Sequence, residues 1–363
     1  MKKEKNINTV IPKQVVYLFG AGSTQAEADH KGGEQVNLLM KDSKRLGRGI
    51  STRILEQAGI DRNYDIKGAD IEKLISLFSA STIEEYNASA EDLRKRYYNE
   101  IVDTLSKVRI LEKPELAIGL LDMHNNIAFK NIETLTGIIT LNHDNLFQVA
   151  SQEVHGGVNL GFKFDSIYFK YDECCTAPVI IQLHGAFNWK NSPPIEVLKL
   201  SARKKENVKN ILWIPPSILK EAKDYPYNKL TGLAYELLTK KCNILRIIGC
   251  SLSQNDWDLI SLIFSAQSYQ YQYNEKSCFR IELIIDQATG ENIKEDYSYL
   301  RNLFPIGYLT DGKRLADFKD KERITSEMNN PFKFWLKTKV QYHLDRKEFD
   351  FTKMNESLKK IIG

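Results

Sequence analysis

Short runs of β-branched and other apolar residues recur along this chain, and they constrain its fold more than any other feature. The runs lie at residues 15–19, 137–141, 179–183, 211–214, 244–248 and 281–285. They are mostly separated by loops or by stretches with helical periodicity. Continuous apolar strands are typical of a parallel sheet that is covered on both faces. We therefore expect an α/β fold with a mostly parallel sheet.

The stretch at about residues 34–131 has a different, helical character. Leu74, Ile75 and Phe78 share one stripe, and residues 91–108 combine charges with spaced apolar positions. This pattern predicts a helical insertion that forms a smaller domain.

The C-terminal part of the chain also has helical periodicity, because Phe332, Trp335 and Leu336 fall on one stripe. We therefore expect one main domain over residues 1–305, which carries the insertion. Residues 306–363 would form a helical extension that packs on the core of this domain.

Composition and charge indicate a cytoplasmic protein. The five cysteines form no CxxC pair, which fits reduced thiols better than disulfides or a zinc finger. No apolar stretch is long enough for a signal-peptide core or a membrane span. A formal net charge of +4 is too small for this length to indicate a nucleic-acid-binding protein. We expect neither membrane association nor direct nucleic-acid binding.

The first apolar run ends in a glycine turn, Gly20-Ala21-Gly22-Ser23. Glycines at 20 and 22 allow a phosphate-bearing ligand to approach the backbone, and the N–H groups of a following helix favour its negative charge. The dinucleotide motif GxGxxG requires a third glycine at position 25, where this chain has Gln25. A phosphate site and an ordinary structural turn both remain as interpretations.

Polar residues that could carry chemistry follow several of the later strands. They are Thr140, Asn142, Asp144, His184, Ser251 and Asp286, and the turn residue Gly249 belongs with them. Each also has an ordinary structural interpretation: Asn142 as a turn residue, His184 as a core histidine, and Asp286 as a helix cap. Asp144 could brace its loop or bind a ribose hydroxyl. Ser23 and Ser251 could contact the ligand or serve as turn hydroxyls.

In their order along the chain, these motifs resemble the sirtuin-like (silent information regulator type) NAD-binding family. Residues 20–23 match its GAGxS turn, Thr140, Asn142 and Asp144 match TxNxD, and His184-Gly185 match its HG pair. Residues 183–189 and 249–253 are similar to the LHGSxNW and GxSLS segments of prokaryotic sirtuin-like NADases. The resemblance covers roughly residues 14–290 and implies a Rossmann-like sheet.

The resemblance also implies roles for these residues. The position of Asn142 holds the nicotinamide ribose or the attacking water, and that of His184 acts as general base. Contacts to NAD would come from Gly20, Ala21, Gly22, Ser23, Thr140, Asp144, Gly249, Ser251 and Asp286. An amide both donates and accepts without changing charge, and an imidazole titrates near working pH, which suits these two catalytic roles.

The chain departs from the deacetylating members of the family in two respects. It lacks the two cysteine pairs of their zinc ribbon and a convincing acyl-lysine-binding segment after His184-Gly185. Water is then the expected acceptor, and the resemblance implies an NAD glycohydrolase that needs no metal. A deacylase and a catalytically silent nucleotide-binding scaffold are the alternatives. The resemblance to prokaryotic sirtuin-like NADases implies a homo-oligomeric antiphage effector that is gated by a separate partner, such as a HerA-type ATPase or a short Argonaute.

Overall fold

A computed structural model describes most of the chain between residues 11 and 284. The described residues are 11–32, 36–42, 46–60, 70–161, 167–169, 174–191, 195–197, 208–217, 224–250, 252, 256–273 and 279–284. Two predicted ligand residues, Ser251 and Asp286, lie outside them, as does the predicted extension at 306–363.

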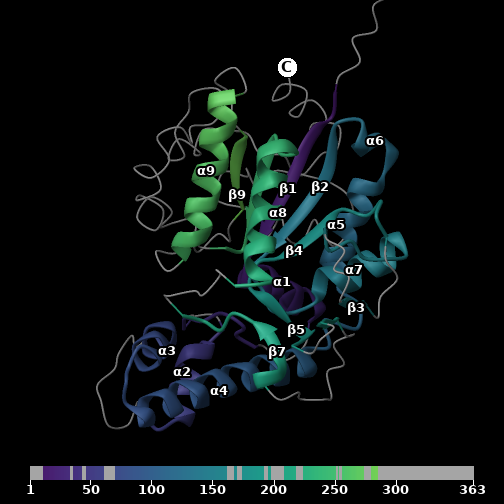
Figure 1. Cartoon of the computed structure of the whole chain (residues 1–363). Helices are drawn as coiled ribbons and strands as arrows, with labels where there is room; N and C mark the ends of the chain where they lie inside the picture. Colours follow the sequence, from purple (N-terminus) through teal and green to yellow (C-terminus); the bar gives the residue numbers. More distant parts are fainter. Residues whose placement is uncertain are drawn as a thin grey trace, which may run out of the picture.

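Five of the described strands form one parallel sheet (Figure 1). They are β1 (Lys13–Phe19), β2 (Glu133–Thr140), β4 (Val179–Gln182), β8 (Ile244–Ile248) and β9 (Arg280–Ile284). Their spatial order is β4-β2-β1-β8-β9, and every neighbouring pair is parallel. The prediction of an α/β fold with a parallel sheet is therefore confirmed.

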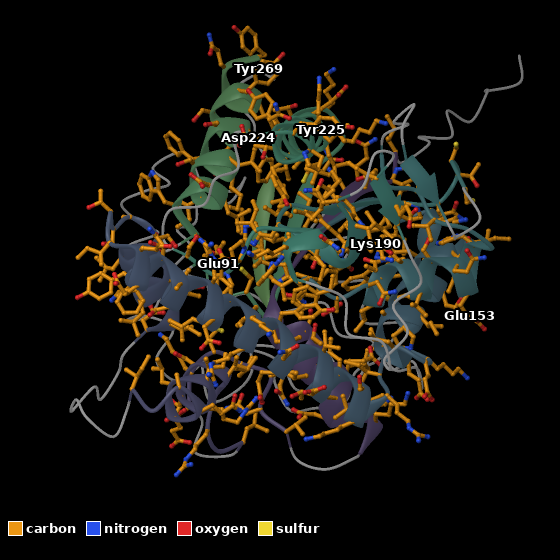
Figure 2. All side chains as sticks on the ribbon, turned by 60° about the horizontal axis from the view of Figure 1, so that its bottom comes forward. Glu91, Glu153, Lys190, Asp224, Tyr225 and Tyr269 are labelled. Carbon is orange, nitrogen blue, oxygen red and sulfur yellow. The ribbon has the colours of Figure 1, made fainter. Side chains whose placement is uncertain are left out.

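Helices pack against this sheet in two groups and share one large apolar core with it. One group comprises α1 (Ala21–Lys31), α5 (Glu115–Asn125) and α7 (Leu146–His155), with the short α6 (Ile127–Lys130) following α5. The other comprises α8 (Tyr227–Lys240) and α9 (Trp257–Tyr273). The inner face of α9 buries Ile260 and Ile263, whereas Tyr269 is 42% exposed and points outward in Figure 2. No helix in the described ranges is long and apolar enough to cross a bilayer.

The apolar run at 211–214 contains a strand, as predicted, but this strand does not join the parallel sheet. It forms β7 (Ile211–Trp213) in a separate sheet with β3 (Ile167–Phe169), β5 (Gly185–Lys190) and β6 (Ile195–Val197). The order is β3-β6-β5-β7, and β5 is antiparallel to both of its neighbours. A short apolar run shows that a strand is buried but does not show which sheet it joins. A 3₁₀ turn, η1 (Val208–Asn210), precedes β7.

The predicted insertion is helical, but its helices belong to two cores. The helices α2 (Ile50–Gln57), α3 (Ile71–Ser79) and α4 (Glu84–Val108) form a second apolar cluster, to which β5 and β7 add Phe187 and Trp213. In contrast, α5 packs in the main core. Figure 1 shows the three helices beyond one end of the parallel sheet, with β5 and β7 between them and that sheet. We call α2, α3 and α4 the helical unit.

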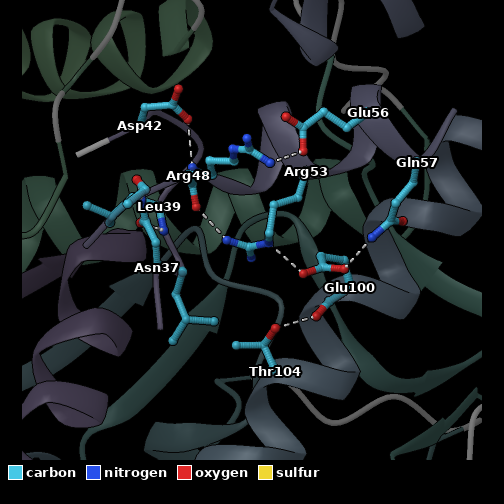
Figure 3. Close-up of polar contacts among 12 residues, drawn as sticks. Asn37, Leu39, Asp42, Arg48, Arg53, Glu56, Gln57, Glu100 and Thr104 are labelled. Atoms are coloured by element: carbon cyan, nitrogen blue, oxygen red, sulfur yellow. Dashed lines mark hydrogen bonds and ion pairs between the residues drawn. The ribbon is translucent and has the colours of Figure 1, made fainter. Parts of the chain in front are cut away.

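Polar contacts fix the connection between α1 and the helical unit (Figure 3). Arg53 donates from Nε to Glu100 Oε1 at 2.7 Å, and one of its terminal nitrogens donates to the Arg48 carbonyl at 2.6 Å. The Gly49 N–H donates to Asp42 Oδ1 at 2.7 Å, and this bond is the main reason why the pKa of Asp42 is lowered. These contacts join α2 to α4 and hold the loop before α2.

Candidate functional site

The two predicted catalytic residues lie at the same edge of the parallel sheet. Strands β2 and β4 are neighbours, and Thr140 is the register partner of Gln182. Asn142 and His184 each follow two residues later, so both leave the carboxyl ends of adjacent strands. Neighbouring strands are about 4.8 Å apart. The Leu183 N–H donates to the Thr140 carbonyl at 3.0 Å, which keeps the two chain segments together beyond the strands.

The amide of Asn142 has a fixed orientation. Its Nδ2 lies 3.0 Å from the Gly20 carbonyl oxygen and 2.8 Å from Thr24 Oγ1, with Ser23 Oγ at 3.3 Å. A carbonyl oxygen only accepts, so the nitrogen must face the turn and Oδ1 must face away from it. Within the described residues no hydrogen bond reaches Oδ1, and Asn142 is only half-buried. The amide therefore braces the glycine turn on one side and offers an acceptor on the other.

Thr24 was missed by the sequence reasoning, although it connects two of the predicted residues. Its hydroxyl donates to Asp144 Oδ2 at 2.7 Å while it accepts from Asn142. The other Asp144 oxygen accepts from the Leu146 N–H at 3.1 Å, at the start of α7. Both oxygens of this carboxylate are thus engaged within the protein, which favours bracing over a ribose contact. Thr24 could have been identified from sequence as a hydroxyl residue in the first helical turn after the two glycines.

Burial dominates the electrostatics of Asp144. It raises the pKa of this carboxyl above its ordinary value, and the hydrogen bonds from Thr24 and Leu146 act in the opposite direction.

Three glycines of the two predicted nucleotide motifs pack against one another. Gly22 donates its N–H to the Gly249 carbonyl at 2.9 Å, and Gly20 donates to Ile248 at 3.1 Å. A Cβ on Gly20 or Gly22 would lie 2.7 Å from Gly249 atoms, and a Cβ on Gly249 would lie 2.4 Å from the Ser23 nitrogen. Gly249 also has a φ of +61°. The absence of side chains here therefore lets the turn after β1 touch the end of β8.

The remaining residues of the glycine turn differ in exposure. Ala21 is exposed at the first position of α1. Ser23 is fully buried, and both its hydroxyl and its N–H donate to the Gly20 carbonyl, at 2.8 Å and 2.9 Å. The contacts of Ser23 are thus those of a turn hydroxyl.

Gln25 has a structural role at the position where the dinucleotide motif has its third glycine. The side chain is fully buried. Its Nε2 donates to the Val36 carbonyl at 2.9 Å, and its Oε1 accepts from the Leu38 N–H at 2.7 Å. The side chain therefore fixes the segment that leads from α1 to the helical unit.

A chain of buried amides lies beneath the loop that carries Asn142. Asn188 of β5 donates to Gln148 of α7 at 2.7 Å, Gln148 donates to Gln182 Oε1, and Gln182 donates to the Asp144 carbonyl at 2.8 Å. Sequence reasoning did not identify these residues, although polar side chains within buried strands were a usable signal for Gln182 and Asn188. This row of hydrogen-bonded amides links both sheets to the candidate site.

His184 keeps access to solvent while the neighbouring His143 does not. His184 is half-buried, and its carbonyl accepts from the Ile214 N–H at 2.8 Å. His143 is buried, and its Nε2 donates to the Ile214 carbonyl at 2.9 Å. The two ring centroids are 6.2 Å apart. Ile214 therefore holds both the His184 backbone and the His143 ring.

The donor set of this site is oxygen- and nitrogen-based, with amides, hydroxyls, one carboxylate and imidazoles. Among the described residues, no three His, Cys, Asp or Glu side chains are grouped so that they could hold a metal ion. The chain matches no model of a known protein family, and comparison with curated proteins found no match either.

Proposed function

We propose that this protein is a Rossmann-like NAD glycohydrolase of sirtuin-like type, which cleaves NAD to nicotinamide and ADP-ribose. The observation that carries the proposal is the paired placement of Asn142 and His184 at the ends of β2 and β4. Numbered along the chain, the parallel strands have the order 3-2-1-4-5. That is the order of doubly wound dinucleotide-binding sheets, in which ligands bind outside the carboxyl ends of the strands.

The roles of the two residues follow from their chemistry. The bond between nicotinamide and ribose breaks with its electron pair moving to the pyridinium ring, and the ribose becomes cationic. Asn142 Oδ1 accepts a hydrogen bond from a ribose hydroxyl or from the attacking water. Water adds to the anomeric carbon, and the His184 imidazole takes the proton that the water loses.

In the cell, such an enzyme must be gated, because constant NAD cleavage would kill its host. We propose a cytoplasmic antiphage effector that acts as a homo-oligomer. Its trigger would be a separate protein, such as a HerA-type ATPase or a short Argonaute. A purified protein that is fully active alone, whatever its assembly state or partner, contradicts the gating.

The test is incubation of the protein with NAD, followed by measurement of nicotinamide and ADP-ribose. Since a general base contributes about 10²- to 10⁴-fold in rate, His184→Ala should lower turnover by that factor. Asn142→Ala should also lose turnover, with urea unfolding as a check because this amide braces the glycine turn. The matched control is His155→Ala at the end of α7, which should leave turnover unchanged.

Two other outcomes would point to the alternatives. Nicotinamide release that requires an added acyl-peptide would indicate a deacylase. NAD or ADP-ribose binding without any nicotinamide release would indicate a silent nucleotide-binding scaffold. The engagement of both Asp144 oxygens within the protein favours this second alternative, because it leaves fewer groups for a reacting sugar.

A further inference from the structure

Thr24 holds the side chain of Asn142 from within the first turn of α1. The two protons of the Asn142 amide have two close acceptors, the Gly20 carbonyl oxygen at 3.0 Å and Thr24 Oγ1 at 2.8 Å. An amide that is held through one proton can pivot about that hydrogen bond, whereas two directional bonds fix its plane. Thr24 therefore decides whether Asn142 Oδ1 keeps a single direction.

The hydroxyl of Thr24 has a defined polarity, because it carries only one proton. Thr24 donates that proton to Asp144 Oδ2 at 2.7 Å, so a lone pair of its oxygen faces the Asn142 amide. A hydroxyl without such an acceptor could turn its proton towards Asn142 and stabilise the flipped amide. The Asp144 carboxylate thus orients Thr24, and Thr24 orients Asn142.

This arrangement is anchored in buried parts of the fold. Thr24 is 5% exposed and Asp144 is 8% exposed. The second oxygen of Asp144 accepts from the N–H of Leu146, the first residue of α7, at 3.1 Å. The hydrogen bonds therefore connect the first turn of α1 to the first turn of α7, with the half-buried Asn142 next to them. Side chains supported in this way by two helices have little freedom to reorient.

We propose that Thr24 is a positioning residue for the cleavage of NAD. Its hydroxyl, oriented by Asp144, keeps Asn142 Oδ1 directed away from the glycine turn, where this oxygen accepts from a ribose hydroxyl or from the attacking water. Thr24 acts through Asn142 and not by contact with NAD. This inference rests on the proposed NAD glycohydrolase function and adds the residue that holds its catalytic amide in place.

The experiment compares Thr24→Val, which removes the hydroxyl and keeps the shape, with Thr24→Ser, which keeps the hydroxyl. The values of kcat and KM for NAD cleavage and the urea midpoint are measured for both variants and the wild type. Since a misplacement of about 1 Å can cost about 10²-fold in rate, Thr24→Val should lower kcat about ten- to hundredfold. Thr24→Ser should keep kcat close to the wild-type value. Thr24→Ala removes the same hydroxyl without a branched side chain and should reproduce the loss.

Thr104→Val is the matched control. Thr104 is also buried, at 7% exposed, and its hydroxyl donates to the Glu100 carbonyl within α4 at 2.7 Å (Figure 3). The control should lower the urea midpoint about as much as Thr24→Val does, and it should leave kcat and KM unchanged. A fall in urea midpoint with an unchanged kcat for Thr24→Val would assign Thr24 a purely structural role.

Asp144→Asn tests the order in which these residues act. Its amide nitrogen can take the place of Oδ2 and donate to Thr24, which leaves the Thr24 proton without its acceptor. This variant should therefore also lower kcat. If Asp144 acts through Thr24, the double variant Thr24→Val/Asp144→Asn should be no slower than the slower single variant. Losses that multiply would contradict the route from Asp144 through Thr24.

The outcomes separate this inference from the proposed function. If the wild type cleaves NAD but Thr24→Val and Thr24→Ala keep the wild-type kcat, the inference on Thr24 is wrong and the proposed function stands. A Thr24→Ser variant as slow as Thr24→Val would show that the hydroxyl is not the group that matters. If the wild type neither binds nor cleaves NAD, the proposed function fails and the inference on Thr24 fails with it.

Discussion

At the scale of single residues, Glu27 joins two helices through a buried carboxylate. Glu27 is fully buried on α1, and its oxygens accept from the N–H groups of Leu116 at 3.0 Å and 3.1 Å and of Ala117 at 3.2 Å. These groups begin α5, where Pro114 provides no side-chain cap. Burial raises the pKa of Glu27 to about 7, and the backbone hydrogen bonds act against that rise.

This shift predicts a pH dependence of stability. Because the folded-state pKa is higher than the unfolded value of 4.5, the folded protein binds more protons between pH 4.5 and about 7. The contribution of Glu27 to the free energy of unfolding therefore falls as pH rises through that window. Glu27→Gln removes this contribution, so from pH 5 to pH 8 the variant should gain about 2–3 kcal/mol relative to the wild type.

Urea unfolding of both proteins at several pH values measures this difference. The control is Glu153→Gln, which changes an exposed glutamate on α7 (Figure 2) and, as a surface substitution, should change the free energy of unfolding by less than about 0.5 kcal/mol. A difference between Glu27→Gln and the wild type that does not change with pH would contradict the assignment.

At the scale of elements, the contact between the β1–α1 turn and the end of β8 depends on Gly249. An alanine there would have to adopt a φ of +61° and place its Cβ 2.4 Å from the Ser23 nitrogen. Gly32 at the end of α1 also has a positive φ, of +67°, but nothing lies within 4 Å of its Cβ position. The two glycines thus share a conformation and differ in packing.

We expect Gly32→Ala to lower the free energy of unfolding by about 1 kcal/mol, as for other left-handed glycines. Gly249→Ala should lower it by about 1–3 kcal/mol more, because the turn and the strand end must move apart. Urea unfolding of both variants measures the two losses. Equal losses would show that the close contact around Gly249 is not tight in solution.

The sequence predicted the parallel sheet better than it predicted the second sheet. The five strands of the parallel sheet lie in apolar runs bounded by turn residues, a strong signal. In contrast, β3, β6 and β7 have only three residues each, too few for a periodicity to emerge. The pairing of β5 with β7 depends on Gly185, whose φ of +69° brings its backbone against Leu212.

The candidate site was also predictable only in part. Asn142 and His184 could be placed at strand ends from sequence, because apolar runs precede both. The hydrogen-bond partners of Asn142 could not be predicted from sequence. Gly20 and Thr24 are distant from it along the chain and come next to it only because β1 and β2 are neighbouring strands. Gln25 departs from the motif GxGxxG, and only the fold shows that its side chain holds the connection to the helical unit.

At the scale of the whole molecule, a buried ion pair spans the centre of the parallel sheet. Arg246 of β8 donates to both oxygens of Glu133 of β2 at 2.7 Å, and these side chains are 5% and 0% exposed. Arg246 also donates to the Tyr17 hydroxyl of β1 at 3.0 Å, and this hydroxyl lies 3.0 Å from Nε2 of His124. Burial and the nearby Arg246 charge lower the pKa of His124, so its neutral ring can accept from Tyr17.

Removing one member of this pair should be more harmful than replacing both. Arg246→Met leaves a buried carboxylate without its partner and should cost about 3–5 kcal/mol. The double variant Glu133→Leu/Arg246→Met should recover most of that loss, because no buried charge remains. Urea unfolding of the single and double variants forms the test. A double variant as unstable as the single one would show that the pair does more than neutralise charge.

The second apolar cluster sets an order of events when the chain is made. Its helices α2, α3 and α4 leave the ribosome first, whereas Phe187 and Trp213, which cover Tyr98 and Tyr97, follow only after β2, α7 and β4. During synthesis, the nascent helices therefore expose the rings of Tyr97 and Tyr98 until Phe187 and Trp213 have been made. Exposed apolar surface of this kind is bound by chaperones. The second apolar cluster is therefore complete only when β7 has been made, well after its three helices.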